Sequence, residues 1–299
     1  MNVLISENRI WWGKDGTSFP AVKQFLSEVG GRKASSLLLY EDYGHTDMAK
    51  KDLIKLFPDL SKVPFDTPKP VKLIKMLALL GTKDGDIILD FFAGSGTTAQ
   101  SILELNAEKG THRKFILIQL AEPLTNNADA IKNNLLTISD VAEERIRRAG
   151  RKIKEEAPLT TMDLDTGFRV FKLDTSNMKD VYYAAGDYNQ GMLEGLESNI
   201  KEDRTEMDLL FGCLLDWGLP LSLPYASEVI DDCMVQTYNE GDLIACFADN
   251  VPESVVKAIA RRKPLRAVFR DASFADSPSK INVGEIFKLL APETSVKVI

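Results

Sequence analysis

Apolar and polar positions repeat along this chain with two periods, and these periods predict strands and helices in turn. Residues 87–91 form a short apolar run, and residues 115–120 form a second one. Short continuous runs of this kind are typical of parallel strands buried on both faces. Helical spacing between them begins at Thr97, whose side chain can cap the helix. Strand, helix and strand in this order predict a right-handed βαβ unit, with Asp90 at the carboxyl end of its first strand.

Apolar spacing also predicts the elements before and after this unit. Helices are expected over residues 19–29, 47–57 and 71–81, a short strand or extended run over 37–40, and a long helical stripe from 131 to 153. After residue 206 the expected helices are 206–217, 253–261 and 283–290, and the expected strands are 229–238, 242–247, 265–269 and 295–299. The sequence therefore predicts an α/β protein with a domain at residues 1–160 and a smaller α/β domain at residues 161–299.

Composition narrows the class of protein. The chain has 299 residues, of which 44% are hydrophobic, and no apolar run approaches the roughly 20 residues of a membrane span. The first residues lack the basic start of a signal peptide, so we expect a cytoplasmic protein without a membrane partner. The net charge of −7 argues against general binding to polyanions. Two interpretations of the basic residues from Arg145 to Lys154 stay open: a solvated helix face, which is preferred, and a local strip that contacts phosphates.

Cysteines and acids give no metal site. Cys213, Cys233 and Cys246 have the spacing of neither paired metal ligands nor a disulfide framework, so we expect reduced core cysteines. Asp231, Asp232 and Asp271 lack a converging histidine or further acid. No metal is therefore expected.

Residues 90–98, with the sequence Asp-Phe-Phe-Ala-Gly-Ser-Gly-Thr-Thr, carry the clearest chemical signal. Gly94 and Gly96 permit a tight turn and the close approach of a ligand. A phosphate-binding P-loop requires lysine where Gly96 stands. A dinucleotide fingerprint is matched by Gly94, Gly96 and Ala99, but the acid expected about 20 residues later is replaced by Gln119. The stretch resembles the loop of DNA amino-methyltransferases, in which the acid and the loop backbone hold the methionine part of S-adenosyl-L-methionine (AdoMet).

Two other stretches are expected near this loop. Residues 65–70 precede the helix at 71–81, and a helix placed before the first strand would bring Asp66 and Lys69 close to the glycines. The second strand ends at Gln119, and Glu122 follows three residues later. One of these two should meet the ribose hydroxyls, and Glu122 is narrowly preferred because a carboxylate is the stronger acceptor.

Six motifs make the chain similar to the carboxyl-terminal part of the Mod subunit, the DNA adenine-N6 methyltransferase of type III restriction-modification systems. They are residues 8–12, 44–46, 65–71, 89–98, 144–150 and 167–173. The resemblance extends over nearly the whole chain. It implies AdoMet as the cofactor of a partial, Rossmann-like parallel sheet. The residues that it places at the cofactor are Asp66, Lys69, Asp90, Phe92, Gly94, Gly96, Gln119 and Glu122.

The chain departs from the family in one respect, because it contains neither Asp-Pro-Pro-Tyr nor Asn-Pro-Pro-Tyr. In the family this motif holds the adenine amino group and stacks on the flipped base. We therefore expect no catalytic residue in these 299 residues and no methyltransferase activity from the chain alone. The part that reads DNA should also lie upstream of Met1.

The resemblance implies three partners: DNA, contacted through the upstream parts, a restriction (Res) subunit, and a second Mod in a possible homodimer. Two alternatives remain open. The first is a non-catalytic assembly module whose second domain binds the restriction subunit or a second Mod. The other is an NAD-dependent oxidoreductase, which would bind NAD rather than AdoMet.

Overall fold

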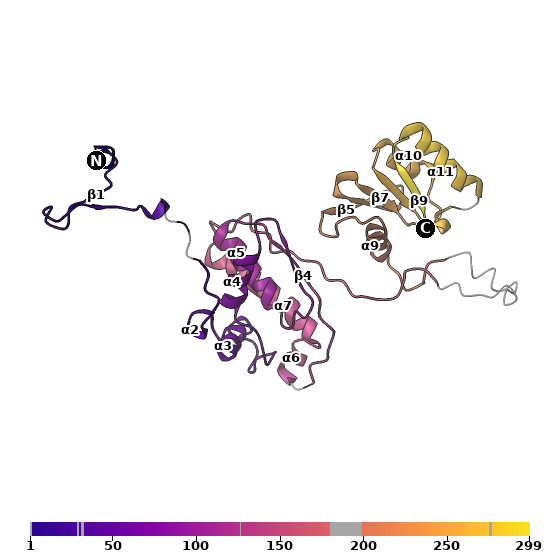
Figure 1. Cartoon of the computed structure of the whole chain (residues 1–299). Coiled ribbons are helices and arrows are strands. Elements are labelled where there is room, and N and C mark those ends of the chain that lie inside the picture. The colour runs from indigo at the N-terminus through magenta and orange to yellow at the C-terminus, as the bar shows by residue number, and fades with distance from the viewer. Residues whose placement is uncertain (1, 29, 31–32, 126, 180–198, 275–276) are drawn as a thin grey trace. The chain divides into compact units, whose positions relative to one another are not determined.

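The computed structural model describes residues 2–28, 30, 33–125, 127–179, 199–274 and 277–299 (Figure 1). The chain divides into two compact units, Met1–Gly167 and Phe168–Ile299. Both contain helices and strands, which confirms the predicted α/β class. None of the described helices is long and apolar enough to cross a membrane.

The first unit begins with short elements. They are α1 (Asn2–Ser6), β1 (Ile10–Trp11), β2 (Ala21–Val22), the 3-10 helix η1 (Leu26–Glu28) and α2 (Tyr40–Tyr43). The predicted helix at 19–29 is wrong, because Ala21 and Val22 pair with β1 instead. Its apolar residues find no covering surface: the side chains of Phe19 and Leu26 are almost fully exposed. An amphipathic helix of this length needs such a surface to be stable. Of the short strand or extended run predicted at 37–40, residues 37–39 form no strand, Leu39 has an extended backbone, and Tyr40 begins α2.

The rest of the first unit is built around a βαβ unit. In chain order its elements are α3 (Thr46–Leu56), α4 (Val71–Gly81), β3 (Ile87–Asp90), α5 (Thr97–Lys109), β4 (Lys114–Leu117), α6 (Ala128–Lys132) and α7 (Ile138–Glu156). Strands β3 and β4 pair in parallel from Ile87 with Lys114 to Asp90 with Leu117, as predicted. Helices α4 and α5 pack together (Figure 1). Their buried Ala78 and Ile102 form a cluster with Ile88 of β3.

The expectation that these strands are buried on both faces is wrong. The side chains that alternate with Ile88 and Phe115 are open to solvent: Ile87 is 60% exposed, Leu89 56% and Ile116 50%. None of the described elements covers this face. Since parallel sheets normally have both faces covered, the pair β3–β4 is the open part of the first unit.

Helix α7 forms a separate core with α3. A capping box between Thr137 and Asp140 begins the helix. Val141 and Ala149 are buried in a cluster with Leu53 of α3 and with Phe57, the C-cap residue of α3. The guanidinium carbon of Arg148 lies 4.5 Å from the centre of the Phe57 ring. The two helices are therefore fixed to each other by apolar packing and a cation–π contact.

The second unit is a five-stranded sheet covered on both faces. Its elements are α9 (Glu206–Asp216), β5 (Tyr225–Ile230), β6 (Cys233–Tyr238), the 3-10 helix η2 (Asn239–Gly241), β7 (Leu243–Cys246), α10 (Glu253–Arg261), β8 (Arg266–Phe269), the 3-10 helix η3 (Asp271–Ser273), α11 (Ser277–Leu290) and β9 (Ser295–Val298). The strand order is β5-β6-β7-β8-β9, antiparallel through β7 and parallel from there on. One core cluster joins the sheet to α10 and α11, and the other joins it to α9 (Figure 1).

One predicted strand of this unit is in fact two. Residues 229–238 belong to β5 and β6, which pair across a turn at Asp231 and Asp232. Both turn residues have positive φ, 45° and 62°, a conformation that aspartate tolerates better than most residues. The predicted hairpin at residues 239–241 is confirmed as the connection of β6 to β7. The three cysteines are buried and form no disulfide, as predicted.

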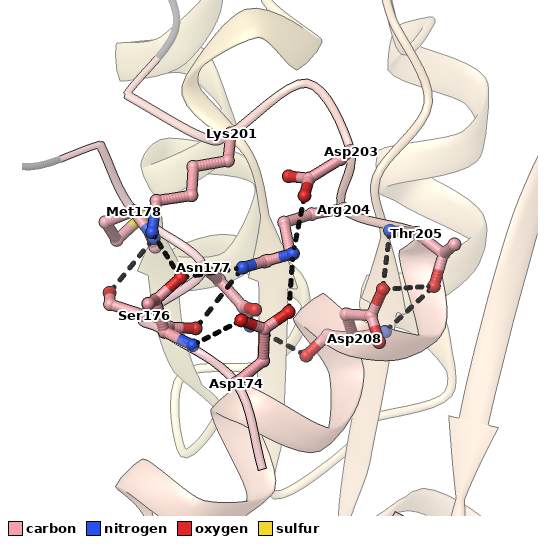
Figure 2. Close-up of polar contacts among 10 residues, drawn as sticks. Asp174, Ser176, Asn177, Met178, Lys201, Asp203, Arg204, Thr205 and Asp208 are labelled. Carbon is pink, nitrogen blue, oxygen red and sulfur yellow. Dashed lines mark hydrogen bonds and ion pairs between the residues drawn. The ribbon is translucent and has the colours of Figure 1, made fainter. Parts of the chain in front are cut away.

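A polar cluster joins residues 174–178 to the start of α9 (Figure 2). Arg204, whose side chain is only 8% exposed, forms ion pairs with Asp174 at 3.3 Å and Asp203 at 3.0 Å. Its guanidinium also donates to the side-chain and backbone oxygens of Thr175, at 3.1 and 3.4 Å. Asn177 donates to the backbone oxygen of Asp208 at 2.8 Å. The cluster therefore anchors residues 174–178, which lie outside the helices and strands, to helix α9 of the second unit.

We expect Arg204→Ala to destabilise the second unit by about 2 kcal/mol, because several hydrogen bonds to a nearly buried charge are lost. Hydrogen exchange of peptides from β7 and β8, which share a core cluster with α9, measures the loss of stability in this unit. Glu202→Ala, at an exposed neighbouring position, is the matched control. Equal exchange protection in the two variants would contradict the anchoring role.

Candidate functional site

The glycine loop connects β3 to α5 and is held between two surfaces. Gly94 and Gly96 have φ of 53° and 75°, in the left-handed region. A Cβ at Gly96 would lie 3.2 Å from the carbonyl oxygen of Ala142 on α7. A Cβ at Gly94 would lie 3.3 Å from the ring of Phe65. The loop therefore requires glycine at both positions for its conformation and for the closeness of its neighbours.

Asp90 lies at the end of β3, where the sequence predicted it. Its Oδ1 accepts a hydrogen bond from the backbone N–H of Phe92 at 3.2 Å, and its Oδ2 accepts one from Thr98 Oγ1 at 2.5 Å. The carboxylate is thus fixed beside the first turn of α5, where the helix dipole favours a negative charge. Gly96, rather than the predicted Thr97, occupies the N-cap position, and Thr97 is the first residue of the helix.

The two candidates for a ribose contact lie in different surroundings. Gln119 Oε1 accepts a hydrogen bond from the backbone N–H of Gly94 at 2.7 Å, so this side chain supports the loop. Glu122 is exposed beyond the end of β4. Only Gln119 is brought into contact with the loop.

The segment at 65–70 is placed beside the loop, but through a residue that sequence analysis did not name. The ring of Phe65 lies against Gly94. The two residues expected at the pocket, Asp66 and Lys69, are exposed. Asp66 is 4.0 Å from Lys50, a distance that makes a weak ion pair. The adjacent Phe92 is 82% exposed, so its ring is open to a ligand.

Arg145 is buried, contrary to the expectation that it lies on a solvated helix face. It is 1% exposed. Its guanidinium donates to Gln100 Oε1 at 2.7 Å, Ser95 Oγ at 2.9 Å and Thr97 Oγ1 at 2.7 Å. Burial lowers the pKa of Arg145 to about 10, against the opposing attraction of two acids. The apolar stripe was the available signal, because Arg145 is four residues after Val141 and four before Ala149.

These groups define what the site can bind. The Asp90 carboxylate can accept hydrogen bonds from a cationic group, and the amino end of α5 favours an anionic one. Phe92 offers an exposed aromatic ring beside them. Among the described residues, no group of three or more His, Cys, Asp or Glu side chains is placed to hold a metal ion.

Comparison with known proteins agrees with this geometry. Residues 8–129 match the family model of DNA methylases. The Mod subunit of the type III restriction-modification enzyme EcoP15I from Escherichia coli is 35% identical over 311 aligned positions, covering 100% of this chain and 44% of that protein. The StyLTI Mod subunit from Salmonella typhimurium is 35% identical over 172 residues, or 58% of this chain and 25% of that protein.

A type II relative matches a shorter stretch. The methyltransferase M.KpnI from Klebsiella pneumoniae is 40% identical over 102 residues, 34% of this chain and 24% of that protein. The chain spans less than half the length of the curated relatives it matches. Residues 8–129 thus match the DNA methylase family, and the whole chain is similar to part of a type III Mod subunit.

Proposed function

We propose that this chain is the cofactor-binding part of a DNA adenine-N6 methyltransferase, and that AdoMet binds at the glycine loop. The observation that carries the proposal is the fixed Asp90 carboxylate beside the amino end of α5. The methionine part of AdoMet has an ammonium group and a carboxylate, which complement these two features. When bound, AdoMet supplies the methyl group for transfer.

The remaining contacts follow from the same placement. Gly94 and Gly96 let the backbone approach the ligand, and Phe92 packs on it. Gln119 or Glu122 meets the ribose, and Asp66 and Lys69 line the outer rim. The parallel pair β3–β4 is then part of a doubly wound sheet, with the ligand at the carboxyl ends of its strands.

Partners and activity follow from the relatives. Two of those described above are Mod subunits of type III restriction-modification enzymes. We propose that the complete protein acts on DNA together with a restriction subunit and that a second Mod joins it. Since the sequence contains no Asp-Pro-Pro-Tyr motif, this chain alone binds the cofactor without transferring its methyl group.

A second function, assembly, is favoured by the open face of β3–β4. Its large apolar side chains are exposed: Ile87, Leu89, Phe91, Ile116, Ile118 and Leu120. Two parallel strands rarely form a stable sheet by themselves. We propose that the polypeptide segment carrying the catalytic motif covers this face. The same segment adds further strands at the edges of the β3–β4 pair. The alternative surface for a restriction subunit or a second Mod is the second unit.

The first test is a calorimetric titration of the purified chain with AdoMet, with NAD as the control ligand. We expect AdoMet to bind and Asp90→Asn to weaken it by about tenfold to a hundredfold, because a charge-assisted hydrogen bond is lost while the shape is kept. Asp86→Asn, at the other end of the same strand, should bind like the wild type. Binding of NAD alone would establish the oxidoreductase alternative, and equal AdoMet affinity in all three proteins would place the site elsewhere.

Assembly is tested by mixing the chain with the part of the EcoP15I Mod subunit that lies outside the aligned region. We expect a one-to-one complex by light scattering that methylates adenine in DNA. Leu89→Ser with Ile116→Ser should weaken the complex at least about tenfold, because two buried apolar contacts are lost. Val229→Ser, equally exposed on β5, is the control. A complex that forms equally well with both variants would exclude this face.

A further inference from the structure

Arg145 carries a positive charge that no ion pair neutralises within the described part of the chain. Its side chain is buried, and its hydrogen bonds go to the neutral oxygens of Gln100, Ser95 and Thr97. Two acids, Glu104 and Asp52, attract it only over a longer range. Buried charges in proteins are normally paired, because an isolated one is costly to remove from water.

The two nearby acids are already paired with lysines. Glu104 forms an ion pair with Lys75 at 3.3 Å, and Asp52 forms one with Lys55 at 2.9 Å. Gln100 stands between Arg145 and Glu104, because it accepts from the guanidinium and donates to Glu104 at 2.9 Å. Lys75 also pairs with Glu108, so it neutralises Glu104 only in part, and the charge of Glu104 reaches Arg145 only through the neutral amide of Gln100. Among the described residues, no carboxylate is in direct contact with the guanidinium of Arg145.

The guanidinium of Arg145 lies directly behind the glycine loop. Arg145 donates to Ser95 and Thr97, and the residue between them is Gly96. The guanidinium stays protonated at neutral pH, since its pKa of about 10 is well above it. Helix α5 begins at Thr97, and the partial positive charge at its amino end adds to the charge of Arg145. Both positive charges favour the binding of an anionic group at the surface of the loop.

We propose that Arg145 is the counter-charge of the cofactor's carboxylate and acts on it through the loop, without touching it. Arg145 is then a positioning and specificity-determining residue that selects nucleosides carrying an amino-acid carboxylate over those that lack one. The inference rests on the proposed function, because it assumes that AdoMet binds at this loop. The low dielectric around a buried guanidinium makes an interaction through the loop effective.

A purely mechanical role gives a different expectation. If Arg145 only fastened the loop to α7, its loss would weaken every ligand of the loop to the same degree. A charge effect instead depends on the ligand's own charge. Decarboxylated AdoMet separates the two roles, because it differs from AdoMet only in the missing carboxylate.

The experiment measures the affinities of the full chain for AdoMet and for decarboxylated AdoMet by calorimetry. We expect Arg145→Met to reduce the preference for AdoMet by about tenfold, and Arg145→Lys to retain most of it, because lysine keeps the charge. Arg148→Met is the matched control. It removes a guanidinium from the same helix that is already paired with Asp59 and Glu144, so the preference should not change.

Each outcome decides between the two roles. An unchanged preference in Arg145→Met, with both ligands weakened equally, overturns the inference and leaves the proposed function intact. Loss of the preference in Arg145→Lys as well as in Arg145→Met also overturns it. If Arg145→Met does not fold by circular dichroism, Arg145→Gln is compared in its place. Failure of the wild type to bind either ligand overturns the proposed function itself.

Discussion

The close contact between Gly96 and α7 is the constraint on which the first unit depends. The loop that follows β3 has its backbone in the left-handed region at Gly96, and a Cβ there would make a tight contact of 3.2 Å with the carbonyl oxygen of Ala142 on α7. Arg145 then fastens the flanking residues to the same helix. Phe65 closes the opposite side at Gly94. Strand, loop, α7 and the segment before α4 therefore hold one another in place.

The two units differ in how the faces of their sheets are covered. In the second unit each face of the sheet has its own core cluster and its own helices. Among the described residues of the first unit, helices α4 and α5 cover one face of β3–β4, and the other face is open to solvent. The glycine loop therefore belongs to the unit whose sheet is the less covered of the two.

Local chemistry determined which parts could be predicted from the sequence. The βαβ unit, Asp90 and the glycine turn were predictable because strand length, glycine positions and helical spacing act over a few residues. The helix predicted at 19–29 failed because its stability depends on a covering surface that the described residues do not supply. The turn at Asp231 and Asp232 was missed because neither residue is a glycine. The burial of Arg145 was missed because its positive charge favoured a solvated face, although its spacing from Val141 and Ala149 places it on the apolar stripe. The role of Phe65 was missed because it arises only where two distant segments meet.

The open face of β3–β4 has a consequence for the life of the chain in a cell. Exposed apolar side chains on a flat strand pair, with backbone edges free to pair, are a template for misassociation during synthesis. A protein with such a face depends on timely covering, and chaperones and proteases act on molecules that wait too long. The open face thus makes the first unit a target for quality control for as long as the face stays uncovered.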